Sequence, residues 1–265
     1  MLATLVGRSL SRHRAIVAGL AALLSAFQFL LVIIATNLQK QGLFSQFAAF
    51  VPPFVQEALG GTLASFSATV ALGFFHPVVM LSLSGGAIYL ASEPAGEVEH
   101  GLVDIVVARP VPRHLMITRS AIVYGGVIAV IVGLMFVANN VAVRLFVPHG
   151  VTLLSRSRLV WVVFNLVAVV WCFGAASLVL AARARRRGTA AGTVALIAIS
   201  LYLLQFGAAA WRTLRPVARI SPFHYYEAMP TLLGFSQPWR NIAGLLIATA
   251  ILFAIAQVLY SRRDL

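Results

Sequence analysis

Six long apolar runs without a charged residue dominate the sequence. They cover residues 15–37, 63–92, 120–143, 159–182, 188–211 and 241–261. Most contain about 21–24 residues, and a helix of that length crosses the roughly 30 Å hydrocarbon core of a bilayer. The runs are continuous and do not alternate with polar residues, which disfavours a β-barrel. The pattern therefore predicts an all-α integral membrane protein with six transmembrane helices.

The composition supports the same fold class. The chain has 265 residues, of which 60% are hydrophobic and only 10% are charged, against about 25% charged residues in soluble domains. A soluble fold of this size could not bury so much apolar surface. No linker, repeat or low-complexity tract divides the chain, so we expect residues 1–265 to form a single transmembrane domain.

The net charge of +13 has a topological meaning in a membrane protein. Basic residues between apolar runs set the orientation and contact anionic lipid headgroups, so we expect the lipid bilayer as a partner and no nucleic acid. Six spans put both termini on one side. The segments on that side hold 12 basic residues and the opposite segments hold 8. We therefore expect a multi-pass protein of the inner (plasma) membrane with both termini in the cytoplasm.

The carboxylates are concentrated in one cytoplasmic segment. Four of the seven lie there, at Glu93, Glu97, Glu99 and Asp104. Proline suits the first turn of a helix and stops a helix further along, and Pro94 and Pro110 hold these two places. The segment is therefore predicted to be a short amphipathic helix parallel to the membrane, followed by a rigid turn, with its acids away from the apolar face.

Three interpretations of this acidic segment remain open. It can be an ordinary solvated loop, because charged runs are usually solvated faces. It can be a docking element for a cytoplasmic partner. It can also supply metal ligands, since Glu97 and His100 are three residues apart and Asp104 follows, but a single Glu-x-x-His is a weak signal. We expect no metal site.

The stretch GEVEHGLVDIVVARPVPRHLMITRS, residues 96–120, resembles the inner loop of ABC type-2 transporter permeases. In that family a Glu-rich helix and a Pro-hydrophobic-x-Arg turn lie between the second and third helices. Arg119 stands where the family usually has Lys. The matching positions are Glu97, Glu99, Gly101, Leu102, Pro110, Val111 and Arg113.

Three other segments are similar to the same family. The basic stretch at residues 7–16, with Arg8, Arg12 and Arg14, resembles an amphipathic N-terminal interface helix. The sequence ISPFHYYEAM at residues 220–229 resembles a Ser-Pro-aromatic stretch between the last two helices. YSRRDL at residues 260–265 is similar to a common C-terminus. The resemblance covers the layout of the whole chain.

The resemblance implies a role for the acidic segment. The family's loop between helices two and three is a coupling helix, which sits in a cleft of a separate ATPase and transmits its closure to the membrane. The acids here would then face basic groups on that ATPase. The positions implied as ATPase-coupling are Glu93, Glu97, Glu99, His100, Gly101, Asp104, Arg109, Pro110 and Arg113.

The chain has no Gly-x-x-x-x-Gly-Lys-Ser/Thr loop, so by this motif it lacks the phosphate site of a P-loop ATPase. We expect it to bind no cofactor itself and not to be an enzyme. The resemblance implies two copies of an ABC ATPase subunit, which would hold ATP and Mg²⁺. It also implies a second copy of the permease or a paralogue.

Polar residues within the apolar runs are candidates for a translocation path, namely His76, Asn139, Asn165 and Gln205. The simpler interpretation is interhelical hydrogen bonding. Pro77 follows His76 and should kink the second helix.

The segment between the fifth and sixth runs is a candidate outer gate. In the resembled family short re-entrant helices lie there, and an aromatic interfacial loop is the alternative. The candidate gate residues are Pro222, Phe223, Tyr226 and Glu227.

Together these features predict the permease subunit of an ATP-driven ABC exporter with a hydrophobic or amphipathic substrate. No carboxylate lies within an apolar run, which disfavours a proton-coupled carrier. The alternatives are a membrane scaffold that recruits a cytoplasmic partner and transports nothing, and a channel or carrier that works without ATP.

Overall fold

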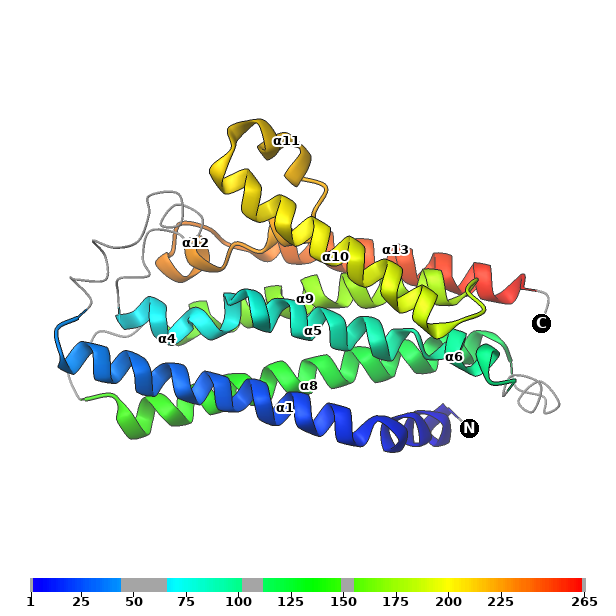
Figure 1. Ribbon diagram of the computed structural model, residues 1–265, viewed down its shortest axis with the longest axis horizontal. Helices are drawn as coiled ribbons and strands as arrows, with labels where there is room; N and C mark the ends of the chain where they lie inside the picture. Colours follow the sequence, from blue (N-terminus) through cyan, green and yellow to red (C-terminus); the bar gives the residue numbers. More distant parts are fainter. Residues whose placement is uncertain (1, 44–65, 102–111, 149–154, 264–265) are drawn as a thin grey trace.

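The computed structural model describes residues 2–43, 66–101, 112–148 and 155–263. These residues form helices and short connections, with no β-strand among them. Figure 1 shows the long helices side by side in one elongated bundle. The elements are α1 (Leu2–Lys40), α4 (Phe66–Phe75), α5 (Pro77–Ala91), α6 (Glu93–Glu99), α8 (His114–Phe146), α9 (Arg156–Ala181), α10 (Arg187–Ala210), η1 (Arg212–Leu214), α11 (Arg215–Ala218), η2 (Pro222–Tyr225), α12 (Ala228–Leu233) and α13 (Trp239–Ser261).

Six helical segments are long and apolar enough to cross a bilayer, which confirms the predicted all-α membrane fold. They are α1, α4 with α5, α8, α9, α10 and α13. Their bounds follow the apolar runs closely, except that α1 and α8 extend well beyond them. α1 has 39 residues, which at about 1.5 Å per residue is nearly twice the thickness of the hydrocarbon core. These are the features of a multi-pass membrane protein.

The expected N-terminal interface helix is not a separate element. Residues 2–40 form one α-helix, so the basic turns of Arg8, Arg12 and Arg14 continue directly into the first span. The segment that joins them contains neither Pro nor a pair of glycines, and nothing therefore interrupts the hydrogen-bond ladder. A change of composition marks the end of the apolar region but does not end a helix.

The second span is broken where proline was expected to kink it. His76 has an extended backbone (ψ 134°) and is the N-cap of α5, with its Nδ1 accepting a hydrogen bond from the Val78 N–H at 3.3 Å. Pro77 lacks an N–H and suits the first turn of the new helix. The span is therefore two helices, α4 and α5, stacked end to end.

The two ends of the bundle carry different elements. Figure 1 shows both chain ends and α6 at one end and α12 toward the other, with α11 at the tip of α10, which projects from the side of the bundle on the α12 side. We call the first the terminal end and the second the far end. An even number of spans brings the chain back to the side on which it started, so both termini lie together.

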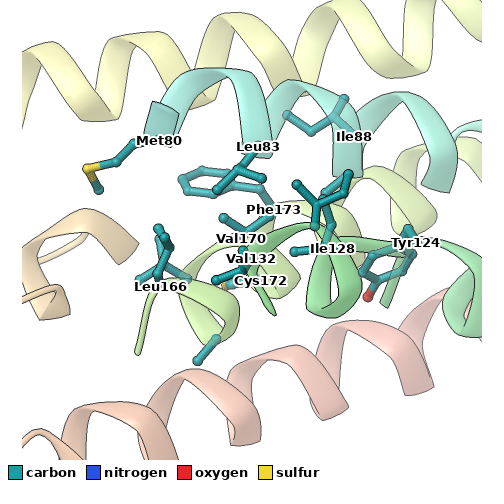
Figure 2. Packing of buried hydrophobic residues seen from close by; sticks show 14 of the residues in the cluster. Met80, Leu83, Ile88, Tyr124, Ile128, Val132, Leu166, Val170, Cys172 and Phe173 are labelled. Atoms are coloured by element: carbon teal, nitrogen blue, oxygen red, sulfur yellow. The ribbon is translucent and has the colours of Figure 1, made fainter. Parts of the chain in front are cut away.

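Helix α9 occupies the centre of the bundle. It contacts α5, α8, α10, α12 and α13, and fully buried side chains on it, such as Leu166 and Leu178, belong to one buried apolar cluster with side chains of α5 and α8. Figure 2 shows this packing. Since lipid is as apolar as these side chains, close packing rather than escape from water favours the assembly.

A small residue allows one of the closest helix contacts. A Cβ atom on Gly174 of α9 would overlap the ring of Tyr124 on α8. In contrast, α10 and α13 lie at the periphery and expose large apolar side chains, among them Leu196 and Ile247. Such exposed apolar faces suit contact with lipid tails.

Candidate functional site

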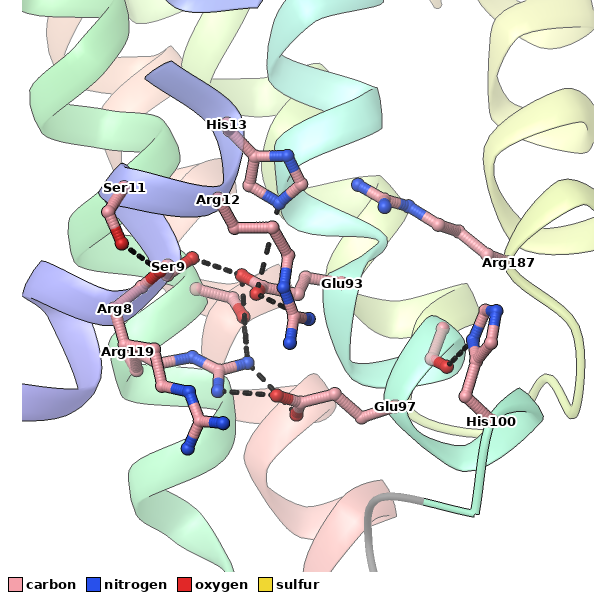
Figure 3. Close-up of polar contacts among 12 residues, drawn as sticks. Arg8, Ser9, Ser11, Arg12, His13, Glu93, Glu97, His100, Arg119 and Arg187 are labelled. Carbon is pink, nitrogen blue, oxygen red and sulfur yellow. Dashed lines mark hydrogen bonds and ion pairs between the residues drawn. The ribbon is translucent and has the colours of Figure 1, made fainter. Parts of the chain in front are cut away.

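Polar and charged side chains gather at both ends of the bundle. At the terminal end they form what we call the charge cluster, shown in Figure 3. It brings together α1, the short helix α6 and the first turns of α8. The charge cluster consists of Ser9, Arg12, His13, Glu93, Glu97 and Arg119.

Arg119 and Glu97 form a buried, bidentate ion pair. Arg119 Nη1 donates to Glu97 Oε1 at 2.7 Å, and Nη2 donates to Oε2 at 3.0 Å. The two residues are only 4% and 8% exposed. The fork of the guanidinium matches the carboxylate, which makes this one of the stronger types of hydrogen bond. The pair fixes α6 to α8.

Glu93 links three helices through its carboxylate. The Ser9 hydroxyl donates a hydrogen bond to Oε2, and Arg119 Nη2 lies 3.7 Å from the same oxygen. Arg12 Nη1 and His13 Nε2 approach Oε1 at 3.7 and 3.8 Å. Both Glu93 and His13 are almost completely buried. One carboxylate therefore holds the start of α6 against α1 and α8.

The neighbours of Glu93 keep it ionised. Burial by itself would raise the pKa of this carboxyl, because desolvation disfavours charge. Contact with His13, the charge of Arg119 and the Ser9 hydroxyl outweigh that effect and lower the pKa from 4.5 to about 2. The His13 contact at 3.8 Å is long for a hydrogen bond, so we attribute more of the shift to Arg119 and Ser9.

This geometry corrects the expected direction of the acids. Glu97 was expected to lie away from the apolar face, and the resemblance implied that both Glu93 and Glu97 meet basic groups of an ATPase. Both point into the bundle instead and pair with residues of this chain (Figure 3). The helical spacing placed them correctly on one short helix, but that helix packs against α8, α9 and α10 and turns their face inward.

Arg187 attaches the start of α10 to the same region. Its guanidinium donates to Ser92 Oγ at 3.1 Å and to the Tyr89 carbonyl at 2.8 Å, and it stacks 3.8 Å above the Tyr89 ring. Its backbone N–H donates to Glu99 Oε2 at 2.8 Å. Glu99 is exposed, and a carboxylate at a helix N-terminus is favourable.

The last described residue of the chain completes these connections. Arg263 donates to the carbonyls of Ala182 and Ala184 at 3.2 and 3.0 Å, in the turn between α9 and α10. Its own carbonyl accepts a hydrogen bond of 2.7 Å from Arg113, just before α8. Arg263 therefore joins the turn between α9 and α10 to the start of α8 through backbone carbonyls.

The other coupling candidates divide into two groups. Glu99, His100 and Gly101 are exposed at the end of α6. Asp104, Arg109 and Pro110 lie outside the described residues. Asp104 is also the third residue of the candidate metal motif. Within the described ranges, no group of three or more His, Cys, Asp or Glu side chains is placed to hold a metal ion.

The far end contains a cavity of about 580 Å³, which we call the aromatic cavity. It lies between α10, the junction of α4 and α5, and the short helices η2, α11 and α12. This size falls within the range of ligand pockets. Its wall includes Phe75, Tyr202, Gln205, Arg219, Phe223 and Glu227.

Three of the four candidate gate residues line this cavity: Phe223, Tyr226 and Glu227. Pro222 does not line it but begins η2. Phe223 is buried, and its ring centroid lies 4.8 Å from that of Phe173 on α9. Four short helices, η1, α11, η2 and α12, lie between α10 and α13. That they are re-entrant stays a prediction.

Only one of the candidate path residues, Gln205, lines the aromatic cavity. Asn139 is buried and donates to the Val70 carbonyl at 2.9 Å. Asn165 is also buried and donates to the Tyr225 carbonyl at 3.0 Å. For these two the simpler interpretation holds, since their amides join helices and connections that would otherwise leave polar groups unpaired.

His76 does not line the cavity, but the helix break that it forms provides a hydrogen-bond acceptor for a residue of the cavity wall. The Val78 N–H bonds to His76 Nδ1, so the carbonyl of Phe74, four residues earlier, loses its usual helical donor. The hydroxyl of Tyr226 donates to that carbonyl at 2.9 Å. Tyr226 therefore attaches residues 222–227, which we call the gate segment, to the break in the second span.

The sequence indicated the acidic residues of α6 but not the residues of this chain that pair with them. Ser9, His13 and Arg187 were not singled out, and Arg119 was noted only for standing in place of Lys. One signal was available, because an Arg at the start of an apolar helix needs a carboxylate when it is buried. Which carboxylate it meets depends on how α6 folds back.

Searches against known protein families and against curated proteins found no match to this chain. The assignment of a function therefore rests on the residues and their arrangement.

Proposed function

We propose that this chain is the membrane-spanning permease subunit of an ATP-driven ABC exporter. A separate ATPase, in two copies, would bind ATP and Mg²⁺ and supply the motor. A second permease copy or a paralogue would complete the translocation path. The resemblance of residues 96–120 and of both chain ends to ABC type-2 permeases is the starting point, and six apolar spans are compatible with it.

The observation that carries the proposal is the attachment of α6. This helix follows the second span with only Ser92 between them. Glu93 and Glu97 join it to α1 and α8, and Glu99 joins it to α10. A force applied to α6 would therefore reach the second span through the chain at Ser92, and α1, α8 and α10 through charge-assisted hydrogen bonds. A coupling element requires this kind of connection.

The proposal assigns the coupling residues to two roles. Glu93 and Glu97 transmit movement within the chain, because they are buried and paired. Glu99 and His100 are exposed and would contact the ATPase together with the residues that follow them, and Glu99 also keeps its contact with the Arg187 N–H of α10. In this proposal Glu93 and Glu97 do not contact the ATPase. They connect the contact surface on α6 to the spans α1 and α8.

At the far end the aromatic cavity would be the last part of the path, with Phe223, Tyr226 and Glu227 as its gate. In this arrangement the terminal end faces the cytoplasm of a cell with an inner (plasma) membrane. The substrate would be hydrophobic or amphipathic, since apolar side chains form much of the wall.

Co-purification with the ATPase tests the proposal. The chain is expressed with an ATPase whose gene lies beside its own and contains a phosphate loop, and both are extracted in mild detergent. Wild type is compared with Glu99→Arg, and Arg240→Glu at the far end is the matched control. We expect wild type and the control to retain the ATPase and to stimulate its activity, and Glu99→Arg to lose most of the complex while its spans stay assembled.

Three results would count against the proposal. Full retention of the ATPase by Glu99→Arg would place the docking surface away from α6. A well-folded chain that binds no ATPase at all would overturn the permease assignment and favour the ATP-independent channel or carrier. A scaffold would bind a cytoplasmic partner without stimulating ATP hydrolysis.

A further inference from the structure

The turn between α9 and α10 carries three exposed arginines. Arg183, Arg185 and Arg186 lie in residues 182–186, and the side chains of all three are exposed. Within the described ranges, no hydrogen bond or ion pair involves their guanidinium groups. The sequence has no acidic residue between Asp104 and Glu227, so no neighbour along the chain offsets these charges.

The end of α13 brings a fourth arginine to this turn. Arg263 donates hydrogen bonds to the carbonyls of Ala182 and Ala184 at 3.2 and 3.0 Å. These bonds hold the end of α13 beside the turn that leads into α10, and both lie at the terminal end in Figure 1. Arg262 is exposed, and its guanidinium has no ion pair in the part of the chain that the structure describes. We call this group the basic patch: Arg183, Arg185, Arg186 and Arg262.

Positive charge exceeds negative charge around the basic patch. Burial lowers the pKa of Arg263, and the neighbouring charge of Arg185 lowers it further, since like charges held close together disfavour each other. Glu99 contacts the same turn, but its carboxylate already accepts a hydrogen bond from the Arg187 N–H at 2.8 Å. Asp264 lies outside the described residues. The basic patch therefore favours an anion.

The basic patch lies at the level where a bilayer carries its phosphates. α9 ends at Ala181, α10 begins at Arg187 and α13 ends at Ser261, and all three helices are candidate membrane spans. Their ends therefore lie at the membrane interface, where the long side chain of arginine reaches the headgroups. The fork of a guanidinium matches two oxygens of a phosphate. A lipid phosphate is therefore an anion within reach of this patch.

An exposed apolar stripe on α13 continues from the basic patch into the membrane. Ile251, Ile255 and Val258 are exposed, and with Arg262 they keep the i, i+4, i+7, i+11 spacing of one helix face. The helix rises about 16 Å from Ile251 to Arg262, roughly half the thickness of the hydrocarbon core. An acyl chain whose headgroup lies at the patch can therefore contact the whole stripe, whereas a soluble acidic partner would contact only the charges.

We propose that the basic patch binds the phosphate headgroup of an anionic phospholipid, with one acyl chain along Ile251, Ile255 and Val258. This inference goes beyond the proposed function, because it concerns a lipid that stays bound on the outside of the bundle. It requires neither an ATPase nor transport. The purified chain alone therefore tests it, whatever the outcome for the proposed function.

The test measures lipid binding to the full chain by native mass spectrometry in a mild neutral detergent. The probes are phosphatidylglycerol and phosphatidylcholine with the same acyl chains, and glycerol 3-phosphate as a headgroup without a tail. We expect the first phosphatidylglycerol to bind about tenfold more tightly than phosphatidylcholine, because each arginine near the surface attracts an anionic lipid. Glycerol 3-phosphate in large excess should not displace it, because it lacks the apolar contact.

Charge variants test the headgroup site. Arg185→Gln/Arg186→Gln should reduce the preference for phosphatidylglycerol to about twofold, since two of the four cations are lost. Arg183→Gln/Arg262→Gln, which takes one cation from each of the two connections, should give a similar loss. Arg212→Gln/Arg240→Gln removes the same net charge from exposed positions at the far end and should keep the tenfold preference. Size-exclusion chromatography verifies that all three variants stay folded.

A phosphatidylglycerol with a diazirine in one acyl chain tests the place of the tail. The full chain is incubated with this probe, illuminated, and digested for mass spectrometry of the labelled peptides. We expect labelling of residues 251–258 of α13. Unlabelled phosphatidylglycerol should prevent this labelling, and Arg185→Gln/Arg186→Gln should reduce it.

Several outcomes would overturn the proposal. Equal binding of the two phospholipids to wild type would exclude a preference for an anionic headgroup. An equal preference in all three double variants would exclude the basic patch as the site. Displacement by glycerol 3-phosphate would indicate a soluble phosphate compound in place of a lipid, and labelling only outside α13 would exclude the stripe. Arginine variants that keep the lipid preference but lose a co-purified ATPase would indicate that the patch binds an acidic protein surface.

Discussion

The carboxylates of the charge cluster are buried and paired at one end of the bundle, whereas the arginines beside the aromatic cavity are exposed at the other. At the terminal end, Glu93, Glu97 and Arg119 are buried and paired across three helices. At the far end, Arg215, Arg219 and Glu227 line an accessible cavity, and within the described ranges no ion pair joins the acid to the arginines. The first arrangement satisfies charges within the chain and stiffens it. The second places exposed arginine side chains around an open cavity.

This difference separates charged residues that are buried and paired from charged residues that are exposed. A buried charge is tolerated only with a partner. The residues of the charge cluster therefore stabilise the protein only while α1, α6 and α8 stay packed together. The arginines at the far end are exposed, so their charge stays solvated and their loss should leave the fold intact. Substitutions at the two ends should therefore differ in their effect on stability.

The largest effect is expected from Arg119→Met at the terminal end. Removal of one partner leaves Glu93 and Glu97 buried without their cation, which should lower the free energy of unfolding by about 3–5 kcal/mol. Thermal unfolding in mild detergent and size-exclusion chromatography measure this loss. Arg185→Met, in the exposed turn before α10, is the matched control. Equal melting of the two variants would show that the charge cluster does not hold the helices.

Acid should weaken the terminal end specifically. The pKa of Glu93 is lowered from 4.5 to about 2, so its contribution is complete above pH 4.5 and is lost as the pH falls through about 2. At about 1.4 kcal/mol per pH unit, the contribution is about 3 kcal/mol. Tryptophan fluorescence during acid titration of wild type and Glu93→Gln measures it. Identical acid sensitivity of both proteins would contradict the ionised, buried Glu93.

A smaller effect is expected where the gate segment meets the helix break. Tyr226→Phe removes the donor to the Phe74 carbonyl and leaves a buried acceptor unpaired, which should cost about 1–2 kcal/mol. Tyr225→Phe is the control, because that neighbouring ring is exposed. Calorimetry or thermal melting distinguishes them. If both variants melt alike, Tyr226 does not fasten the break.

The smallest effect is expected inside the aromatic cavity. Ala209→Leu adds volume to open space and should change stability by no more than about 0.5 kcal/mol. Ala175→Leu adds the same atoms to the fully buried centre of α9 and should cost about 1–3 kcal/mol through overpacking. Melting temperatures of the two variants provide the comparison. An equally destabilising Ala209→Leu would show that the cavity is closely packed.

The sequence by itself determined the six spans and one irregularity within them. Charge-free apolar runs predict helices because each span must satisfy its own backbone in lipid. Pro77 predicts the break because it lacks an N–H, and the structure places that break at His76. The bounds of α9, α10 and α13 follow the apolar runs within three residues, since their composition changes sharply at both ends.

Only the tertiary structure decided where the charged residues point. The spacing of Glu93 and Glu97 placed them on a short helix but did not indicate that α6 folds against α8 and brings Arg119 between them. Likewise, Asn139 and Gln205 are both polar residues within spans, yet one joins two helices and the other faces a cavity. Periodicity assigns a residue to a face of its own helix, whereas the neighbour of that face is set by the packing of helices far apart in the chain.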